Sequence, residues 1–292
     1  MDTPQLDLTV THTSTVTPDQ IDELGHMNVR YYGMNAHAAT TAFCAELGLG
    51  NPSVVSRYTR HHHEQMEGNE LEVRSAVAAA GEAGAGRLCF YHELRDRADD
   101  DLAATFVFEV DHPRVETPGI ELPDYGRPRS LRLDANGLAS APPFEELLER
   151  GLAVRLPRTV TTEDSMGADE VPTWLVNNLI WGGERPDGES DWIRELPNGD
   201  RFAFAVMESR LWVRGTPVPV GTPIQSFGAN VAIADKVVHD VNWCYDTSTG
   251  EPLAAMEGVD VCFNMTERRS MSLPASARAR SEETLFPQYA IS

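Results

Sequence analysis

The sequence predicts an α+β protein built from two similar units, each with one helix followed by antiparallel strands. Three observations predict this class. The chain has 292 residues, which suits two units of about 145 residues each. Its apolar residues recur first at helical spacing and then in strand-like runs. The same order returns about 150 positions further along the chain, so the sequence indicates an approximate internal duplication.

The first unit is expected over residues 1–115. Its helix begins near Met27 and ends at Gly48, a common stop signal. Small and apolar side chains repeat along it at helical spacing: Tyr31, Met34, Ala38 and Ala42. Four strand candidates follow, separated by turns rich in Gly or Asp at 68–69, 81–86 and 97–101: 54–65, 70–80, 87–97 and 102–112.

The rest of the chain repeats this plan after a connector. Residues 116–157 are rich in Pro and Gly and are expected to link the units, with a helical pattern only at 142–151. The second unit is expected over 158–266, with a helix near 171–181 and strands at 202–214, 223–233, 236–246 and 252–264. The polar residues 267–292 are expected to form a flexible tail.

Composition narrows the classes of function. A net charge of −21 disfavours binding to nucleic acid or to an acidic membrane surface. No segment resembles a signal peptide or a membrane span, so a cytoplasmic location is expected. Most of the five tryptophans are expected in the core of the second half. The four cysteines form no C-x-x-C pair and are expected to be buried thiols: Cys44, Cys89, Cys244 and Cys262.

The segment from Asp22 to Asn28, DELGHMN, is dense in reactive groups. Gly25 permits a tight loop just before the helix, whose first N–H groups can hold negative charge. A carboxylate beside such donors provides a base or nucleophile together with an oxyanion site, which thioester hydrolysis requires. The alternative interpretation is that Asp22 and Asn28 only cap the helix and that His26 is a loop residue.

The stretch VTPDQIDELGHMNVRYY resembles the start of the 4-hydroxybenzoyl-CoA thioesterase-like hotdog superfamily. The resemblance implies a tandem (double) hotdog, each unit a central helix wrapped by a curved antiparallel sheet, similar in plan to plant acyl-carrier-protein thioesterases. Many relatives have a second Asn after this motif, where this chain has Val29.

The resemblance also implies roles for residues. Asp22 would be the catalytic carboxylate, acting as general base or nucleophile, with His26 and Asn28 as further catalytic side chains. Backbone N–H groups of His26, Met27 and Asn28 would hold the carbonyl oxygen. Further residues are expected to contact substrate: Gly25, Met27, Tyr31, Asn177 and Asn178.

The second unit departs from the motif. Laid on the first, VTTEDSMGADEVP places Met166 at the position of Asp22 and Glu170 at that of His26. Its acidic residues, Asp164 among them, fit turn or helix capping. We therefore expect one active site per chain, with Asn177 and Asn178 facing it from the second unit.

Other signals are weaker. The run from Arg60 to Glu64 contains three histidines, but no third ligand follows at a recognised spacing, so no metal is expected. Nucleotide-binding fingerprints and a G-x-S-x-G elbow are absent from the sequence. The expected activity is thioester hydrolysis without a cofactor.

The leading prediction is an acyl-CoA thioesterase, acting on acyl-CoA or on acyl-carrier protein, as a monomer or homodimer. CoA phosphates would need arginines, for which five candidates exist: Arg30, Arg57, Arg60, Arg74 and Arg87. A hotdog hydratase or dehydratase is an alternative, although Asp22 lacks the Asn-Pro that usually follows in those loops. A non-catalytic acyl-binding protein is the third possibility.

Overall fold

A computed structural model of the chain divides it into two units, residues 1–134 and residues 135–292. It describes residues 6–79, 87–113, 118–186, 194–196 and 198–291. The division falls inside the expected connector, 116–157. The helix expected there is α2 (Phe144–Glu149), and it belongs to the second unit. The turn expected at 81–86 lies outside the described residues.

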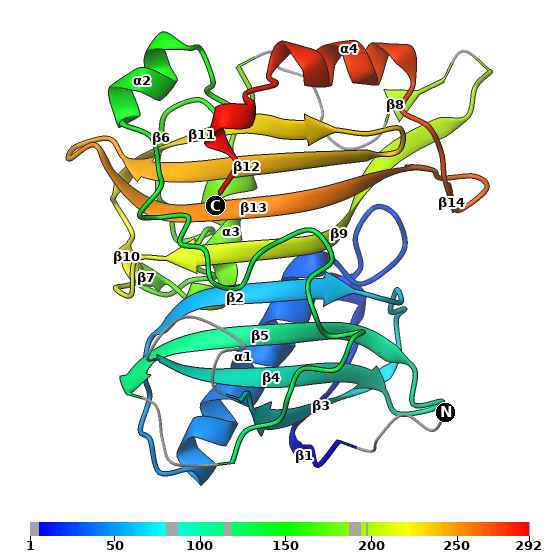
Figure 1. The fold of residues 1–292 in the computed structure, drawn as a ribbon, viewed down its shortest axis with the longest axis vertical. Helices are drawn as coiled ribbons and strands as arrows, with labels where there is room; N and C mark the ends of the chain where they lie inside the picture. The colour runs from blue at the N-terminus through cyan, green and yellow to red at the C-terminus, as the bar shows by residue number, and fades with distance from the viewer. Residues whose placement is uncertain (1–5, 80–86, 114–117, 187–193, 197, 292) are drawn as a thin grey trace. The chain divides into compact units, whose positions relative to one another are not determined.

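The first unit contains an antiparallel sheet in the order β1-β3-β4-β5-β2 (Figure 1). Each of the four predicted strands starts at the predicted residue: β2 (Val54–His61), β3 (Glu70–Val77), β4 (Arg87–Asp96) and β5 (Leu102–Pro113). Strand β1 (Thr9–Thr15) was not predicted, because its sequence TVTHTST has polar residues on both faces. A short 3-10 helix, η1 (Pro18–Gln20), follows it.

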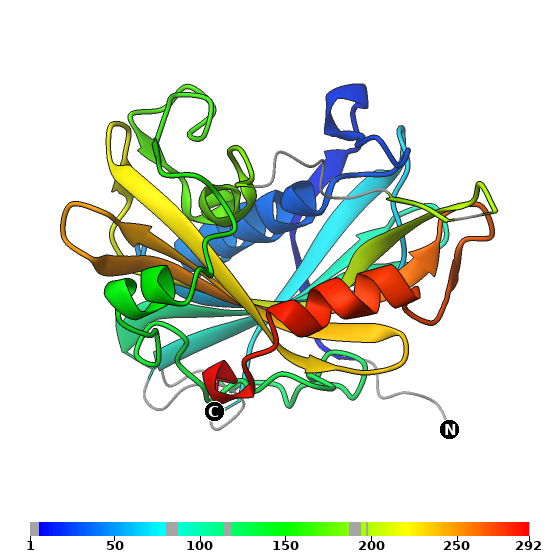
Figure 2. The same cartoon turned by 90° about the horizontal axis from the view of Figure 1, so that it is seen from above.

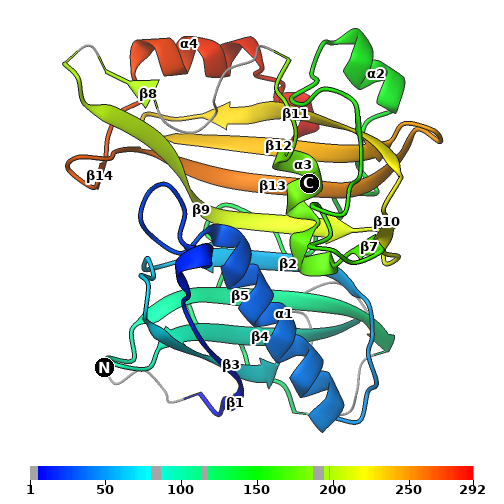
Figure 3. The same cartoon turned by 180° about the vertical axis from the view of Figure 1, so that it is seen from behind.

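Helix α1 (Val29–Glu46) crosses this sheet, as Figure 3 shows. Asn28 caps its first turn, and the chain leaves it through Gly48, whose φ of 69° suits glycine. Ala36 and Ala39 are fully buried, so the helix backbone lies close to the strands. The ring of Phe43 meets that of Phe90 edge to face at 5.4 Å. A buried side chain of this size contributes about 1.5–3 kcal/mol, which fixes α1 on the sheet.

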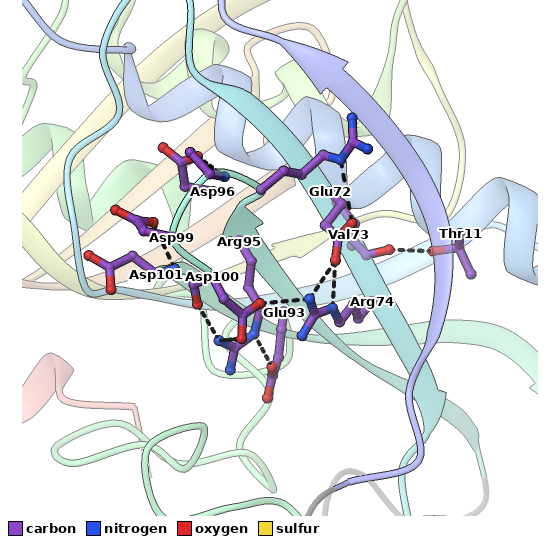
Figure 4. Close-up of polar contacts among 12 residues, drawn as sticks. Thr11, Glu72, Val73, Arg74, Glu93, Arg95, Asp96, Asp99, Asp100 and Asp101 are labelled. Atoms are coloured by element: carbon purple, nitrogen blue, oxygen red, sulfur yellow. Dashed lines mark hydrogen bonds and ion pairs between the residues drawn. The ribbon is translucent and has the colours of Figure 1, made fainter.

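Charged side chains cover the face of β3 and β4 that points away from α1. Arg74 Nη2 lies 2.6 Å from Glu72 Oε1 and 2.6 Å from Asp100 Oδ1. Arg95 lies 2.7 Å from Glu93 and 3.4 Å from the same Asp100 (Figure 4). Asp100 belongs to the predicted turn at 97–101 and has a φ of 62°. Two arginines therefore tie this turn to the sheet.

The second unit contains an antiparallel sheet in the order β9-β13-β12-β11-β6. The four predicted strands start within one residue of the prediction: β9 (Arg201–Val213), β11 (Pro223–Ile233), β12 (Val237–Asp246) and β13 (Glu251–Asn264). Their order matches β2, β3, β4 and β5 of the first unit strand by strand. Short strands complete the unit: β6 (Arg158–Thr159), β7 (Glu170–Val171), β8 (Arg194–Glu195), β10 (Val218–Pro219) and β14 (Arg269–Ser270).

The helix expected near 171–181 is shorter than predicted. It consists of a 3-10 turn, η2 (Thr173–Leu175), and α3 (Asn177–Trp181). Pro172 precedes it, and Gly182 and Gly183 end it, so the local sequence allows only a short helix. Trp212 and Trp243 are buried in the core, while Trp174 and Trp181 pack at its edge. Trp192 lies outside the described residues.

Residues 267–292 differ from the flexible tail that we expected. They contain helix α4 (Ala275–Glu283) and a 3-10 turn, η3 (Pro287–Tyr289), along strand β11 (Figure 2). Ala277 is buried, and the Phe286 N–H donates to the Asn230 carbonyl at 2.7 Å. The few apolar residues of this polar segment therefore fix it to the sheet. In the described part of the chain, no helix combines the length and the apolar character of a membrane span.

Candidate active site

The loop before α1 closes on itself between Ile21 and Met27, which pair as an isolated antiparallel bridge. The Asp22 N–H donates to the His26 carbonyl at 2.9 Å, and the Gly25 N–H donates to the Asp22 carbonyl at 3.0 Å. Gly25 has a φ of 85°, a conformation that favours glycine. The loop thus brings Asp22 back beside His26, four residues later.

Asp22, His26 and Glu64 form a row at the start of α1. His26 Nδ1 lies 3.4 Å from Asp22 Oδ2, and its Nε2 lies 3.6 Å from Glu64 Oε1. The Asp22 side chain keeps 18% of its surface exposed, and that of Glu64 keeps 44%. The other Asp22 oxygen, Oδ1, accepts the Leu24 N–H at 2.9 Å. One carboxylate oxygen is therefore held by the loop, and the other faces the imidazole.

Asn28 is the N-cap of α1. Its Oδ1 accepts the Arg30 N–H at 3.1 Å. No described hydrogen bond joins the Asn28 side chain to Asp22, the residue that we expected it to orient. The structure thus gives the Asn28 side chain the capping role that the sequence left as the alternative.

The backbone donors near Asp22 differ from those expected. The Met27 N–H donates to the Gln65 carbonyl at 2.7 Å, and the Asn28 N–H donates to the Gln20 carbonyl at 2.9 Å. Both are therefore engaged within the protein. Among the described residues, the N–H groups of His26 and Val29 have no hydrogen-bond partner. N–H groups without a partner at the start of a helix can hold an oxyanion.

Three side chains around this loop belong to the core. Met27 is 1% exposed, so it lies beneath the loop rather than on its surface. The Tyr31 hydroxyl accepts from Arg30 at 3.1 Å and donates to the Asp19 carbonyl at 3.4 Å. Tyr32 donates to the His63 carbonyl at 3.3 Å. Burial first, and then the charge of Asp22, raises the pKa of Tyr32, so this phenol stays protonated.

Residues 16–147 match the model of a protein family described as the Thioesterase-like superfamily. The matched range contains the loop, helix α1 and strands β2 to β5. This part of the chain, a little less than half of its length, is therefore similar to the Thioesterase-like superfamily. No protein of curated function matches the chain.

Two solved structures show the likeness of the fold. The 12:0-ACP thioesterase from Umbellularia californica is 9% identical, with a TM-score of 0.59 over 88% of this chain and 94% of that one. An acyl-ACP thioesterase from Bacteroides thetaiotaomicron is 9% identical, with a TM-score of 0.53 over 87% of this chain and 97% of that one. At this identity the likeness is one of fold, which is of the hotdog type predicted from the resemblance.

Within residues 16–147, Glu64 is the residue of the site that sequence reasoning missed. It ends the run from Arg60 to Glu64, which we considered only as a metal site. His61 meets the Tyr32 ring edge to face at 5.0 Å, and His63 lies 3.5 Å from Asp101. Neighbouring histidines thus have separate partners, and the described residues contain no cluster of three or more His, Cys, Asp or Glu suited to a metal. The four cysteines are buried thiols.

The corresponding segment of the second unit lacks these groups. Met166 has a φ of 54° and is followed by Gly167, so a turn is present without a carboxylate at its start. Asp164 Oδ2 accepts from Arg158 at 2.7 Å and from the Thr161 N–H at 2.8 Å, which is a structural role. Asn177 begins α3, and its Oδ1 is buried without a partner in the described residues. The Asn178 carbonyl accepts the Gly182 N–H at 2.7 Å.

The five arginines that were candidates to bind CoA phosphates differ in their partners. Arg74 and Arg87 pair with carboxylates, and Arg60 donates to the carbonyls of Asp124 and Arg127. Arg30 and Arg57 have no ion pair with a described carboxylate, and the Nε of each is buried without a hydrogen bond. Both lie beside α1.

Proposed function

We propose that this protein is an acyl-CoA thioesterase, which converts an acyl-CoA and water into a carboxylic acid and the free thiol. The observation that carries the proposal is the row of Asp22, His26 and Glu64 at the start of α1, in which two carboxylates flank an imidazole. The match of residues 16–147 to the Thioesterase-like superfamily supports the reaction class. The reaction needs no cofactor, because the thioester is already activated.

Asp22 acts as the general base in this proposal. Its Oδ2 takes a proton from a water molecule, and the water oxygen attacks the thioester carbonyl carbon. The N–H groups of His26 and Val29 stabilise the oxygen that becomes negative. The carbon–sulfur bond then breaks, and the departing thiolate takes up the proton. His26 orients the water, because its imidazole lies beside the Asp22 carboxylate, with Nδ1 3.4 Å from Oδ2.

The second unit completes the proposed enzyme as a degenerate hotdog. The strand-by-strand correspondence of the two sheets supports a tandem hotdog with one active site. Asn177 and Asn178 contribute to substrate binding in this proposal, because Asn177 offers a buried amide oxygen that no described residue uses. Gly25 lies in the exposed part of the loop and is the proposed substrate contact of the first unit, whereas Met27 and Tyr31 are buried.

Thiol release from a panel of acyl-CoAs tests the proposal. Asp22→Asn keeps the shape of the side chain and is expected to lower kcat by at least ~10²-fold. Glu23→Gln is the matched control, because Glu23 is an exposed carboxylate in the same loop. Undiminished turnover by the Asp22 variant would remove Asp22 from the mechanism. Hydrolysis of acyl-carrier-protein thioesters without hydrolysis of any acyl-CoA would show that the substrate carrier is the protein rather than CoA.

Oxygen labelling separates the two roles of Asp22. A single turnover in H₂¹⁸O labels the released acid when water attacks the thioester directly. If Asp22 were instead the nucleophile, the label would enter its carboxylate and reach the product only in later turnovers. An increase in hydroxyacyl-CoA from an enoyl-CoA would support the hydratase alternative.

A further inference from the structure

Arg57 is the arginine of β2 that faces α1. The residue is partly exposed, but its Nε is buried without a hydrogen-bond partner. No carboxylate within the described ranges forms an ion pair with its guanidinium. Burial lowers the pKa of Arg57 to about 10, so the side chain remains charged at neutral pH.

Gly33 lies against the guanidinium, and the charge of Arg57 acts on His37 and His61. A Cβ on Gly33 would lie 2.3 Å from Arg57 Nη1, so the glycine makes room for the cation. Burial and the charge of Arg57 lower the pKa of His37 to about 4. Burial, Arg57 and His62 lower the pKa of His61 to about 3. Both imidazoles are therefore neutral at pH 7, and none of these neighbours balances the charge of Arg57.

A cation enclosed in this way is unfavourable unless an anion joins it. Arg74 and Arg87 of the same unit meet this requirement with carboxylates of the protein. Arg57 does not, although glycine at position 33 leaves space for its guanidinium. An arginine without a protein partner, beside a candidate site, indicates that a ligand supplies the anion.

Tyr32 connects Arg57 to the candidate active site. Its ring lies 5.0 Å from the His61 ring, and the charge of Asp22 acts on its hydroxyl. Gly33 follows Val29, the first residue of α1, by four residues, which is about 6 Å along the helix axis. An acyl group held at Asp22 and running along α1 would therefore reach Arg57 with its far end.

We propose that Arg57 binds a carboxylate at the far end of the acyl group, so that ω-carboxyacyl thioesters are the preferred substrates. The inference rests on the proposed function for the reaction at Asp22. A carboxylate matches the planar guanidinium with two parallel hydrogen bonds. The phosphates of CoA are the other anions of the substrate. The experiments below distinguish binding of Arg57 to a phosphate from its binding to the acyl carboxylate.

The first test compares glutaryl-CoA with valeryl-CoA, which has the same carbon chain without the second carboxylate. The wild type is expected to favour glutaryl-CoA by at least ~10²-fold in kcat/KM. Arg57→Met abolishes that preference by lowering glutaryl turnover alone, and Arg57→Lys retains part of it because the charge remains. Arg132→Met is the matched control, because Arg132 lies at the surface beside Asp134.

Two results would overturn the inference. One is equal kcat/KM of the wild type for glutaryl-CoA and valeryl-CoA, across longer pairs as well. The other is an equal loss on both CoA thioesters in Arg57→Met with no loss on the corresponding pantetheine thioesters. That second pattern would assign Arg57 to a CoA phosphate.

A binding measurement keeps the inference separate from the proposed reaction. Calorimetric titration of the Asp22→Asn protein with intact thioesters should give a Kd for glutaryl-CoA at least ~10-fold below that for valeryl-CoA. Adding Arg57→Met should remove the difference while the circular dichroism spectrum stays unchanged. If the wild type hydrolyses no thioester, the proposed function fails, and this titration still decides on Arg57. Equal Kd values would refute the carboxylate site.

Discussion

Replacing Asn28 separates helix capping from participation in catalysis. Its Oδ1 accepts one hydrogen bond, from the Arg30 N–H at 3.1 Å. Asn28→Ala removes this bond and leaves one N–H of the first helical turn without a protein acceptor. Loss of such a cap typically costs about 1 kcal/mol. For a chain of this size, that lowers Tm by about 2–4 °C. Asn28→Asp keeps an acceptor and adds a negative charge that the helix N-terminus favours, so stability should be retained.

Calorimetric melting and kcat/KM on the best acyl-CoA are measured on the same preparations. Asn51→Ala is the control, because Asn51 is exposed and lies in a loop. If Asn28 acts only as a cap, the Asp variant keeps kcat/KM within a few-fold while the Ala variant melts earlier. A loss of ~10² or more in the Asp variant, with Tm retained, would show that the amide takes part in the chemistry. An unchanged Tm in the Ala variant would refute the capping energy.

Two further predictions concern the Gly25 loop and the buried acids of the second unit. Gly25→Ala and Gly48→Ala both place a side chain at positive φ in open space, so each should cost about 1–2 kcal/mol in guanidinium chloride unfolding. Only Gly25→Ala should lower the rate of thiol release. Equal rates for the Gly25→Ala and Gly48→Ala variants would show that the loop takes no part in catalysis. Burial is the largest cause that raises the pKa of Asp240 from 3.8 to about 6, so the native state keeps a proton that the unfolded chain releases as pH rises. The free energy of unfolding of Asp240→Asn, relative to that of the wild type, should rise between about pH 4 and pH 6 and stay constant above that window; a pH-independent difference would contradict the shift.

Local patterns predicted the long elements of both units well. Strands β2 to β5 are bounded by turns whose Gly and Asp residues are visible in the sequence, and α1 has an Asn cap and a Gly stop. β1 escaped prediction because its partner β3 lies about 60 residues away and its own residues are polar. The length of the helix at 171–181 was overestimated. Its apolar pattern covers the whole range, but Pro172 and Gly182 flank the segment and leave room only for a short helix.

The candidate site was predictable only where it is local. Asp22, Gly25 and His26 lie in one loop, and their spacing brings the carboxylate and imidazole together. The partners of the backbone donors were not predictable, because the Gln65 carbonyl that engages Met27 comes from a segment beyond β2. Glu64 was missed for the same reason.

The C-terminal segment has a consequence for association between molecules. Strand β11 pairs with β6 only at Pro223 and Ile224, so much of its outer edge has no long partner strand in the described structure. At Asn230 that edge is occupied instead by the chain after α4, through a bridge to Leu285 and a hydrogen bond from Phe286. An uncovered strand edge can recruit a strand from a neighbouring molecule. The polar helix α4 and the turn after it therefore act as a built-in barrier to edge-to-edge aggregation along this part of β11.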